Sequence, residues 1–174
     1  ARGAITSLYL ESQPALPLAS AEVLLCVRAV GLNFRDVLNV LGEYPGDPGP
    51  PGGDAAGEVS VAATATWSDV RSIFGLAHAP LASLAIAASS LVASKPSNMS
   101  FEQASTLPVT WSTTHVAVER AALHAACSMM IQAAVGGVGL KAVEYTLWLR
   151  ALPSGSAGRS HKHAHLSATG VGTP

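Results

Sequence analysis

The sequence predicts a β-rich domain followed by the first part of an α/β domain of the Rossmann type, a doubly wound dinucleotide-binding fold. Two observations lead to this prediction. Short runs of apolar and β-branched residues, separated by turn-forming residues, recur over positions 1–107. Within positions 108–174, a glycine-rich run stands between a strand-like segment and a helix-like segment. We therefore place the domain boundary between residues 107 and 108.

Four runs in the first part of the chain predict strands, because they alternate or are continuously apolar and contain β-branched residues. These runs cover residues 4–10, 22–30, 56–62 and 82–88. A short helix is expected at 34–41, with Asn33 as its N-cap and Gly42 at its end. Four prolines and four glycines in residues 44–53 predict an ordered loop.

Helices are expected after residue 100. Ser100 is followed three residues later by Gln103, which is the pattern of a capping box. Residues 115–123 are typical of a helix, and the apolar residues 127–132 predict a buried strand.

The glycine-rich run is the strongest functional signal. Residues 137–142, Gly-Val-Gly-Leu-Lys-Ala, fit the dinucleotide-binding pattern G-x-G-x-x-G/A, and Gly136 precedes them. We expect the first glycine to permit a tight turn and the second to let a pyrophosphate approach the backbone. The helix that follows would present its N–H groups and partial positive charge to the phosphates. Its apolar face is expected to hold Leu140, Val143 and Leu147.

Composition limits the class of protein. Of the 174 residues, 49% are hydrophobic and 12% are charged, with a net charge of −1, which indicates a globular domain and no nucleic-acid or membrane-surface binding. The run at 79–93 is too short to span a bilayer. Cys26 and Cys127 are expected to be buried, reduced thiols of a cytoplasmic protein, with a disulfide as the less favoured alternative.

Six blocks along the chain together resemble the enoyl reductase domain of type I polyketide synthases and animal-type fatty acid synthases. This family belongs to the zinc-independent medium-chain dehydrogenase/reductases, related to quinone oxidoreductases. The blocks are residues 30–38, 41–46, 53–59, 73–77, 104–109 and 136–139.

The resemblance implies a GroES-like β-barrel substrate domain at 1–107 and a partial Rossmann NADPH-binding domain at 108–174. It implies reduction of the 2,3 double bond of a trans-2-enoyl thioester on an acyl carrier protein, alongside other domains of a synthase. Two alternatives are a free-standing quinone or alkenal reductase and a non-catalytic truncated remnant. Because only 35 residues follow Gly139, we expect an incomplete Rossmann sheet, and a homodimer would form through its missing part.

The resemblance also assigns roles to three residues. Tyr44 matches a candidate donor of a proton to the substrate α-carbon, and a phenol is protonated at neutral pH. Asn33 matches a residue near the nicotinamide, and Thr113 matches a cofactor-contacting threonine. The alternatives are packing of Tyr44 on the prolines, helix capping by Asn33 and a helix-start hydrogen bond by Thr113. Asp36 is expected to be structural.

Basic residues after the glycine run favour NADPH. Residues 156–162 resemble the family segment Thr-Ala-Gly-Ser-x-x-Lys, which places Gly158, Arg159 and Lys162 beside the cofactor. NAD-type sites carry an acidic residue about 20 residues beyond the glycine turn, whereas this chain has no Asp or Glu after Glu144. Arg159 and Lys162 are therefore expected to contact the 2′-phosphate, with a solvated helix terminus as the alternative.

A catalytic zinc ion is not expected. Zinc-dependent relatives use Gly-His-Glu where this chain has Gly53-Asp54-Ala55, and a cysteine ligand near the position of Asn33. Pro153 falls in the expected second Rossmann strand and argues against regular pairing there. Lys141 and the histidines at 161, 163 and 165 are expected to face solvent.

Overall fold

A computed structural model of the chain describes residues 3–14, 17–63, 67 and 70–172. The chain divides into two compact units, Ala1–Val109 (unit 1) and Thr110–Pro174 (unit 2). Each unit has its own hydrophobic core. The substrate and cofactor roles assigned to the two parts of the chain stay predictions.

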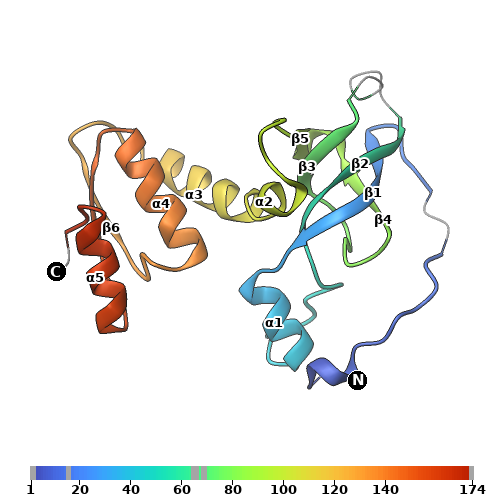
Figure 1. Cartoon of the computed structure of the whole chain (residues 1–174), viewed down its shortest axis with the longest axis horizontal. Helices are drawn as coiled ribbons and strands as arrows, with labels where there is room; N and C mark the ends of the chain where they lie inside the picture. The colour runs from blue at the N-terminus through green and yellow to red at the C-terminus, as the bar shows by residue number, and fades with distance from the viewer. Residues whose placement is uncertain (1–2, 15–16, 64–66, 68–69, 173–174) are drawn as a thin grey trace. The chain divides into compact units, whose positions relative to one another are not determined.

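Unit 1 is built on one antiparallel sheet with the strand order β4-β1-β2-β3-β5 (Figure 1). Buried side chains on this sheet include Val23, Leu25 and Ile73, which pack with Trp67. The pairing of β1 with β2 places Gly31 opposite Asp54. The strands are β1 (Glu22–Gly31), β2 (Asp54–Ala62), β3 (Ser72–Leu76), β4 (Leu84–Ala88) and β5 (Val92–Ser94).

Most of the predicted elements of unit 1 are confirmed. Helix α1 (Phe34–Leu41) ends at Gly42, which has a left-handed φ of 77°. Helix α2 (Phe101–Ser105) starts with the predicted capping box, in which the Ser100 N–H donates to Gln103 Oε1 at 3.0 Å. A short 3₁₀ helix, η3 (Ser89–Leu91), joins β4 to β5.

The predicted strand at 4–10 is wrong. Residues Ile5–Ser7 form a 3₁₀ turn, η1. Ile5 and Leu8 are 74% and 59% exposed, so the apolar residues of this run do not face the core of the sheet. An apolar alternation stabilises a strand only where one face is buried.

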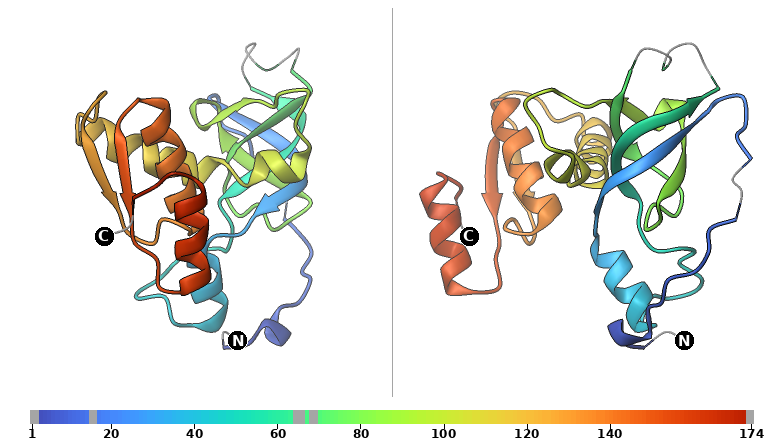
Figure 2. Two further views of the ribbon diagram at one scale, coloured as in Figure 1. Left: turned by 60° about the vertical axis from the view of Figure 1, so that its left-hand side comes forward. Right: turned by 45° about the vertical axis from the view of Figure 1, so that its right-hand side comes forward.

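The described residues of unit 2 form two parallel strands and three helices (Figure 2). A parallel bridge between Ser154 and Gly172 lies at the other edge of β7. The core holds Ile131, Ala142 and Leu166. The elements are α3 (Pro108–Arg120), which begins in unit 1, β6 (Ser128–Ile131), α4 (Gly137–Trp148), β7 (Leu152–Gly155) and α5 (Ser160–Ala168).

The predicted face of helix α4 is wrong in two of its three residues. Val143 is buried, but Leu140 and Leu147 are 40% and 47% exposed. The buried face instead carries small side chains, Gly139, Ala142, Val143 and Thr146. Small residues let the helix lie close to the sheet, and their spacing of three and four keeps them on one face.

Pro153 does not prevent regular pairing, contrary to the prediction. Strand β7 pairs with β6 through Pro153, which lies opposite Met129. The Leu152 N–H donates to the carbonyl of Cys127, just before β6, at 2.8 Å, and the Ser156 N–H donates to the carbonyl of Ile131 in β6 at 3.0 Å. The Gly155 N–H points to the other edge. Successive residues of a strand alternate in this way, so the missing N–H of Pro153 falls on the edge away from β6.

Cys26 and Cys127 are free thiols and only half-buried, not fully buried. Lys141 is half-buried, and its ammonium pairs with the exposed Glu144 at 2.6 Å and lies 5.5 Å from the Trp111 ring centre. None of the described helices is long and apolar enough to cross a membrane.

Candidate functional site

The glycine turn of unit 2 joins β6 to α4. Gly136 is the N-cap of α4, and its N–H donates to the Ala133 carbonyl at 2.7 Å. Gly137, Val138 and Gly139 then occupy the first turn of the helix, where N–H groups have no acceptor within the helix. Gly137 and Val138 are exposed. This arrangement suits an anion such as a pyrophosphate.

The two motif glycines have different steric surroundings. A Cβ at Gly139 would lie 2.3 Å from the Ala133 carbonyl oxygen, so Gly139 is required by packing within the turn. A Cβ at Gly137 would meet only Thr110 Cγ2, at 3.7 Å, so this position opens onto free space. The close packing contact therefore falls on the second glycine of the motif. The left-handed residue of the turn is Ala133, with φ 49°.

A second turn, from β7 to α5, lies at the same ends of the parallel strands. The Ala134 N–H donates to the Ser156 carbonyl at 3.0 Å and ties the two turns together. Arg159 is the N-cap of α5 and is exposed, as is Gly158, while Lys162 is half-buried. In open α/β sheets, ligands bind outside the carboxyl ends of the strands, which is where both turns lie.

Thr113 lies in α3 and its side chain is exposed. The α3 residue that lies beside the glycine turn is instead Thr110, whose methyl group is the nearest atom to a Cβ built at Gly137. Thr110 was not predicted from the sequence, although it stands one helical turn before Thr113 on the same helix.

Unit 1 contains a pocket of about 390 Å³. Its walls come from the start of α1, the 44–53 loop, the end of β3 and the start of α3. Asn33, Arg35, His78 and Val109 are among the side chains that line it. Tyr44 is half-buried and is not among the described residues that line the pocket. Its N–H donates to the Leu38 carbonyl at 3.3 Å.

Asp54 is a buried carboxylate, 2% exposed, at the first position of β2. Its Oδ2 accepts a hydrogen bond from Asn33 Nδ2 at 2.9 Å, and its Oδ1 accepts one from the Val109 N–H at 2.7 Å. Burial raises the pKa of this carboxyl, and the two hydrogen bonds oppose that shift. Asn33 stands at the N-cap of α1 as predicted, but its side chain contacts Asp54.

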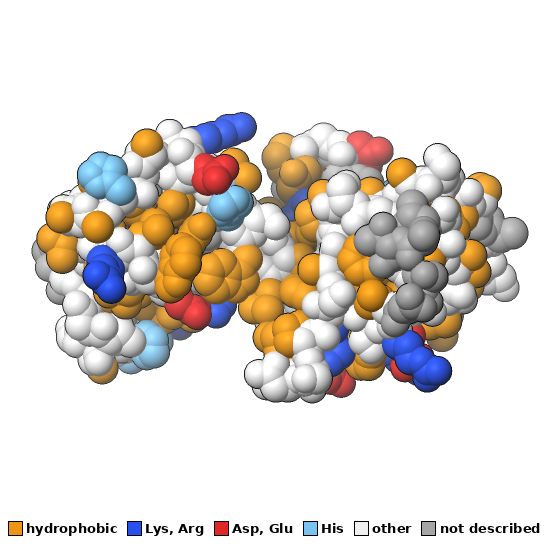
Figure 3. Space-filling view, turned by 90° about the horizontal axis from the view of Figure 1, so that it is seen from above, with side chains coloured by type: hydrophobic (Ala, Val, Ile, Leu, Met, Phe, Trp, Pro, Cys, Tyr) orange, Lys and Arg blue, Asp and Glu red, His pale blue; other side chains and the backbone are white. Residues whose placement is uncertain are grey.

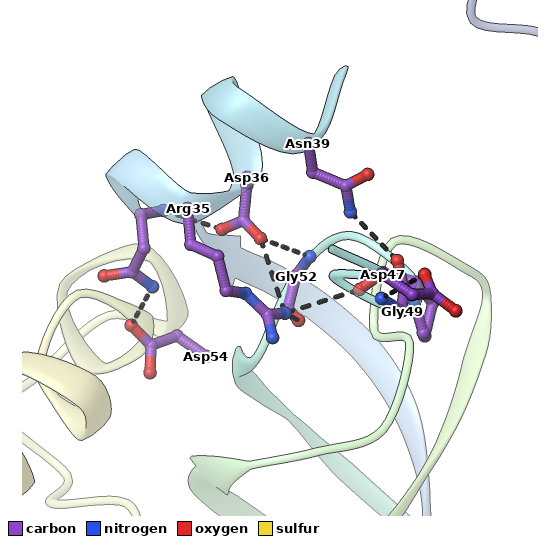
Figure 4. A network of polar contacts seen from close by, with 9 residues as sticks. Arg35, Asp36, Asn39, Asp47, Gly49, Gly52 and Asp54 are labelled. Atoms are coloured by element: carbon purple, nitrogen blue, oxygen red, sulfur yellow. Dashed lines mark hydrogen bonds and ion pairs between the residues drawn. The ribbon is translucent and has the colours of Figure 1, made fainter. Parts of the chain in front are cut away.

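Asp36 organises the loop that forms part of the pocket (Figure 4). One of its oxygens accepts the Asn33 N–H and the other the Gly52 N–H, both at 2.8 Å. Arg35 adds a bond to the Gly52 carbonyl at 2.9 Å, and Asn39 holds the Gly49 carbonyl at 3.0 Å. Polar side chains of α1 thus order the proline- and glycine-rich loop. The structural role predicted for Asp36 agrees with these contacts.

Within residues 3–14, 17–63, 67 and 70–172, no three His, Cys, Asp or Glu side chains gather closely enough to hold a metal ion. Asn33 and Asp54 instead bond to each other.

A second hollow, of about 520 Å³, lies in unit 2 between α3 and α4. Its walls are Trp111, His115, Tyr145 and Trp148, with Tyr145 between the two tryptophan rings at centre distances of 5.6 and 5.4 Å. Trp148 is 71% exposed. Hydrophobic side chains are prominent on the face of unit 2 that Figure 3 shows.

Solved structures define the class of protein. The chain is 32% identical to the enoyl reductase CurK, with a TM-score of 0.87 over 99% of this chain and 56% of that one. A quinone oxidoreductase of Thermus thermophilus, studied also in complex with NADPH, is 29% identical, with a TM-score of 0.77 over 95% and 54% of the two chains. The chain is thus similar to medium-chain dehydrogenase/reductases of the branch that holds enoyl reductases and quinone oxidoreductases.

Within that branch, the curated relatives are type I polyketide synthases. An erythronolide synthase of Saccharopolyspora erythraea is 38% identical over 178 aligned residues, which cover 97% of this chain and 5% of the relative. A spectinabilin polyketide synthase protein of Streptomyces orinoci is 41% identical over 82% of this chain and 7% of its own length. The chain thus spans about half of the solved structures and less than a tenth of these relatives. No protein-family profile matches it. The predicted fold class and family resemblance are confirmed.

Proposed function

We propose that the chain provides the substrate-side unit and the phosphate-binding turns of an NADPH-dependent enoyl reductase in a type I polyketide synthase. The observation that supports this most directly is the open glycine turn at the carboxyl ends of β6 and β7, in a chain similar to polyketide synthases. The substrate would be a trans-2-enoyl thioester on an acyl carrier protein. Residues 1–107 would form the substrate domain and residues 108–174 the cofactor domain.

The cofactor, when bound, would supply a hydride to the β-carbon of the enoyl group. The N–H groups of Gly137, Val138 and Gly139 would bind its pyrophosphate at the N-terminus of α4. Arg159 and Lys162, at the start of α5, would bind the 2′-phosphate. The described part of α5 holds no acidic residue, which favours an anionic group beside it.

Two residues of unit 1 would act on the reacting groups. Asn33 lines the pocket of unit 1 and would lie near the nicotinamide. Tyr44 would donate the proton that the α-carbon gains when the double bond is reduced. Thr113 would contact the cofactor from α3, with Gly136 and Gly158 flanking the phosphate-binding turns. A cytoplasmic synthase and a homodimer through the Rossmann domain remain predictions.

The function is tested by NADPH oxidation in the parent synthase with a crotonyl thioester of pantetheine. We expect one NADPH oxidised for each double bond reduced, with saturated thioester as product. A parallel assay replaces the thioester with benzoquinone, because a quinone oxidoreductase also resembles the chain. Oxidation with the quinone but not with the thioester would replace this proposal by a quinone reductase.

Lys162→Ala is expected to raise the apparent KM for NADPH about tenfold, since a lost charge-assisted contact to phosphate removes roughly 1.5 kcal/mol. The KM for NADH, which has no 2′-phosphate, should change little. The matched control is His165→Ala, an exposed residue farther along the same helix. Equal changes for both cofactors would reject the 2′-phosphate role of Lys162.

A further inference from the structure

The hydrogen bond between Asn33 and Asp54 has a chemical direction. A carboxylate only accepts hydrogen bonds, whereas a side-chain amide has a donor end and an acceptor end. Asn33 must therefore turn Nδ2 toward Asp54, and the contact is 2.9 Å long. Its Oδ1 consequently lies on the other side of the amide, away from the carboxylate.

The second oxygen of Asp54 holds the carboxylate in place. Oδ1 accepts the Val109 N–H at 2.7 Å, near the start of helix α3. Asp54 is 2% exposed, so water does not compete for either oxygen. The Asn33 amide is thus held by a buried carboxylate, each of whose oxygens accepts a hydrogen bond from the protein.

Asn33 and Val109 both line the pocket of about 390 Å³, whereas Asp54 is buried. We propose that Asp54 is a positioning residue, which orients the Asn33 amide so that Oδ1 accepts a hydrogen bond from the nicotinamide half of NADPH. This inference rests on the proposed function. The donor would be the carboxamide N–H₂ or a hydroxyl of the adjoining ribose, both of which need an acceptor.

Asp54→Asn tests the proposal because it reverses the direction of the contact with little change of shape. The Val109 N–H still needs an acceptor, so the new amide turns its oxygen toward Val109. Its nitrogen then faces Asn33, which must rotate its own amide to present Oδ1 to that donor. The pocket would then meet Asn33 Nδ2, a donor, where the ligand also has a donor.

In the parent synthase, we expect Asp54→Asn to lower kcat/KM for NADPH at least about tenfold, the equivalent of one lost hydrogen bond of roughly 1.4 kcal/mol. The affinity for 2′,5′-ADP, measured by calorimetry, should not change, because this probe lacks the nicotinamide half. Asn33→Ala removes the acceptor directly, so it should also lower kcat/KM for NADPH and leave the affinity for 2′,5′-ADP unchanged. In the Asn33→Ala background, Asp54→Asn should cost nothing further.

The 3-acetylpyridine analogue of NADPH, which lacks the carboxamide N–H₂, distinguishes the two donors. If Asp54→Asn impairs NADPH but not the analogue, the carboxamide is the partner; equal impairment identifies the ribose hydroxyl. Both results support the proposal.

Arg28→Ala is the matched control, because Arg28 lies on the same strand as Gly31, makes an exposed contact with Glu58 at 2.8 Å, and does not line the pocket or bond to Asn33 or Asp54 among the contacts described. It should leave kcat/KM for NADPH near the wild-type value. An active wild-type enzyme with unchanged kinetics in Asp54→Asn, or in Asn33→Ala if the first variant does not fold, would overturn only this inference. Absence of thioester reduction by the wild type would overturn the proposed function with it.

Discussion

Gly139→Ala is expected to destabilise unit 2 by about 1–3 kcal/mol, the usual cost of forcing a methyl group into a packed site. The added Cβ would lie 2.3 Å from the Ala133 carbonyl oxygen and 2.7 Å from Ala134 Cα. Both are backbone atoms, so no flexible side chain can move aside. Ala134 is fully buried in the core of this unit, and displacing it disturbs the packing of α4. Hydrogen exchange in a peptide covering α4 measures the effect and assigns it to unit 2.

Gly137→Ala is the matched control, two residues earlier in the same turn. Its Cβ would meet only Thr110 Cγ2, at the ordinary contact distance of 3.7 Å. Stability should therefore stay the same or rise slightly, because alanine restricts the unfolded chain more than glycine does. NADPH affinity should fall about tenfold or more, since the methyl group occupies space beside the N–H groups of α4. Equal stability of the two variants would contradict the packing role of Gly139.

The contrast between these glycines shows what the sequence can and cannot predict. The motif places a phosphate-binding turn at 136–139 and a helix after it, and both features are found in the structure. It does not reveal which glycine is required by packing, because that depends on the path of Ala133 and Ala134. In the same way, a helical pattern alone did not show that small residues, not leucines, face the sheet.

The buried hydrogen bonds of Asp54 in unit 1 were harder to predict from the sequence. Asp54 bonds to Asn33 and Val109, which are 21 and 55 residues away, and no local pattern indicates such contacts. Arg35 and His78 could not be predicted as pocket residues either, because they line the same pocket only where α1 meets the end of β3 in the folded chain. The strands were predictable because their apolar faces are buried, and the run at 4–10 failed because its apolar residues are not.

Asp36→Ala is expected to lower the stability of unit 1 by about 2–4 kcal/mol, because two separate contributions are lost. The substitution removes the acceptor at the start of α1, where loss of a helix cap costs about 1 kcal/mol. It also leaves the Gly52 N–H, in a buried glycine, without its 2.8 Å partner, at a cost of about 1–3 kcal/mol. Urea unfolding is followed by the fluorescence of Trp67, which packs in the core of this unit, in a background where Trp111 and Trp148 of unit 2 are replaced by Phe.

Asp47→Ala provides the comparison, because Asp47 belongs to the same loop and its carboxylate accepts the Gly49 N–H at 3.0 Å. Asp47 is exposed, so water can replace the lost acceptor, and the change in unfolding free energy should be much smaller than for Asp36→Ala. The two substitutions remove the same atoms, but Asp36 is buried and accepts two backbone N–H groups, whereas Asp47 is exposed and accepts the Gly49 N–H. Equal losses would mean that burial of the Asp36 contacts does not stabilise the loop, and that the pocket wall is held mainly by its prolines.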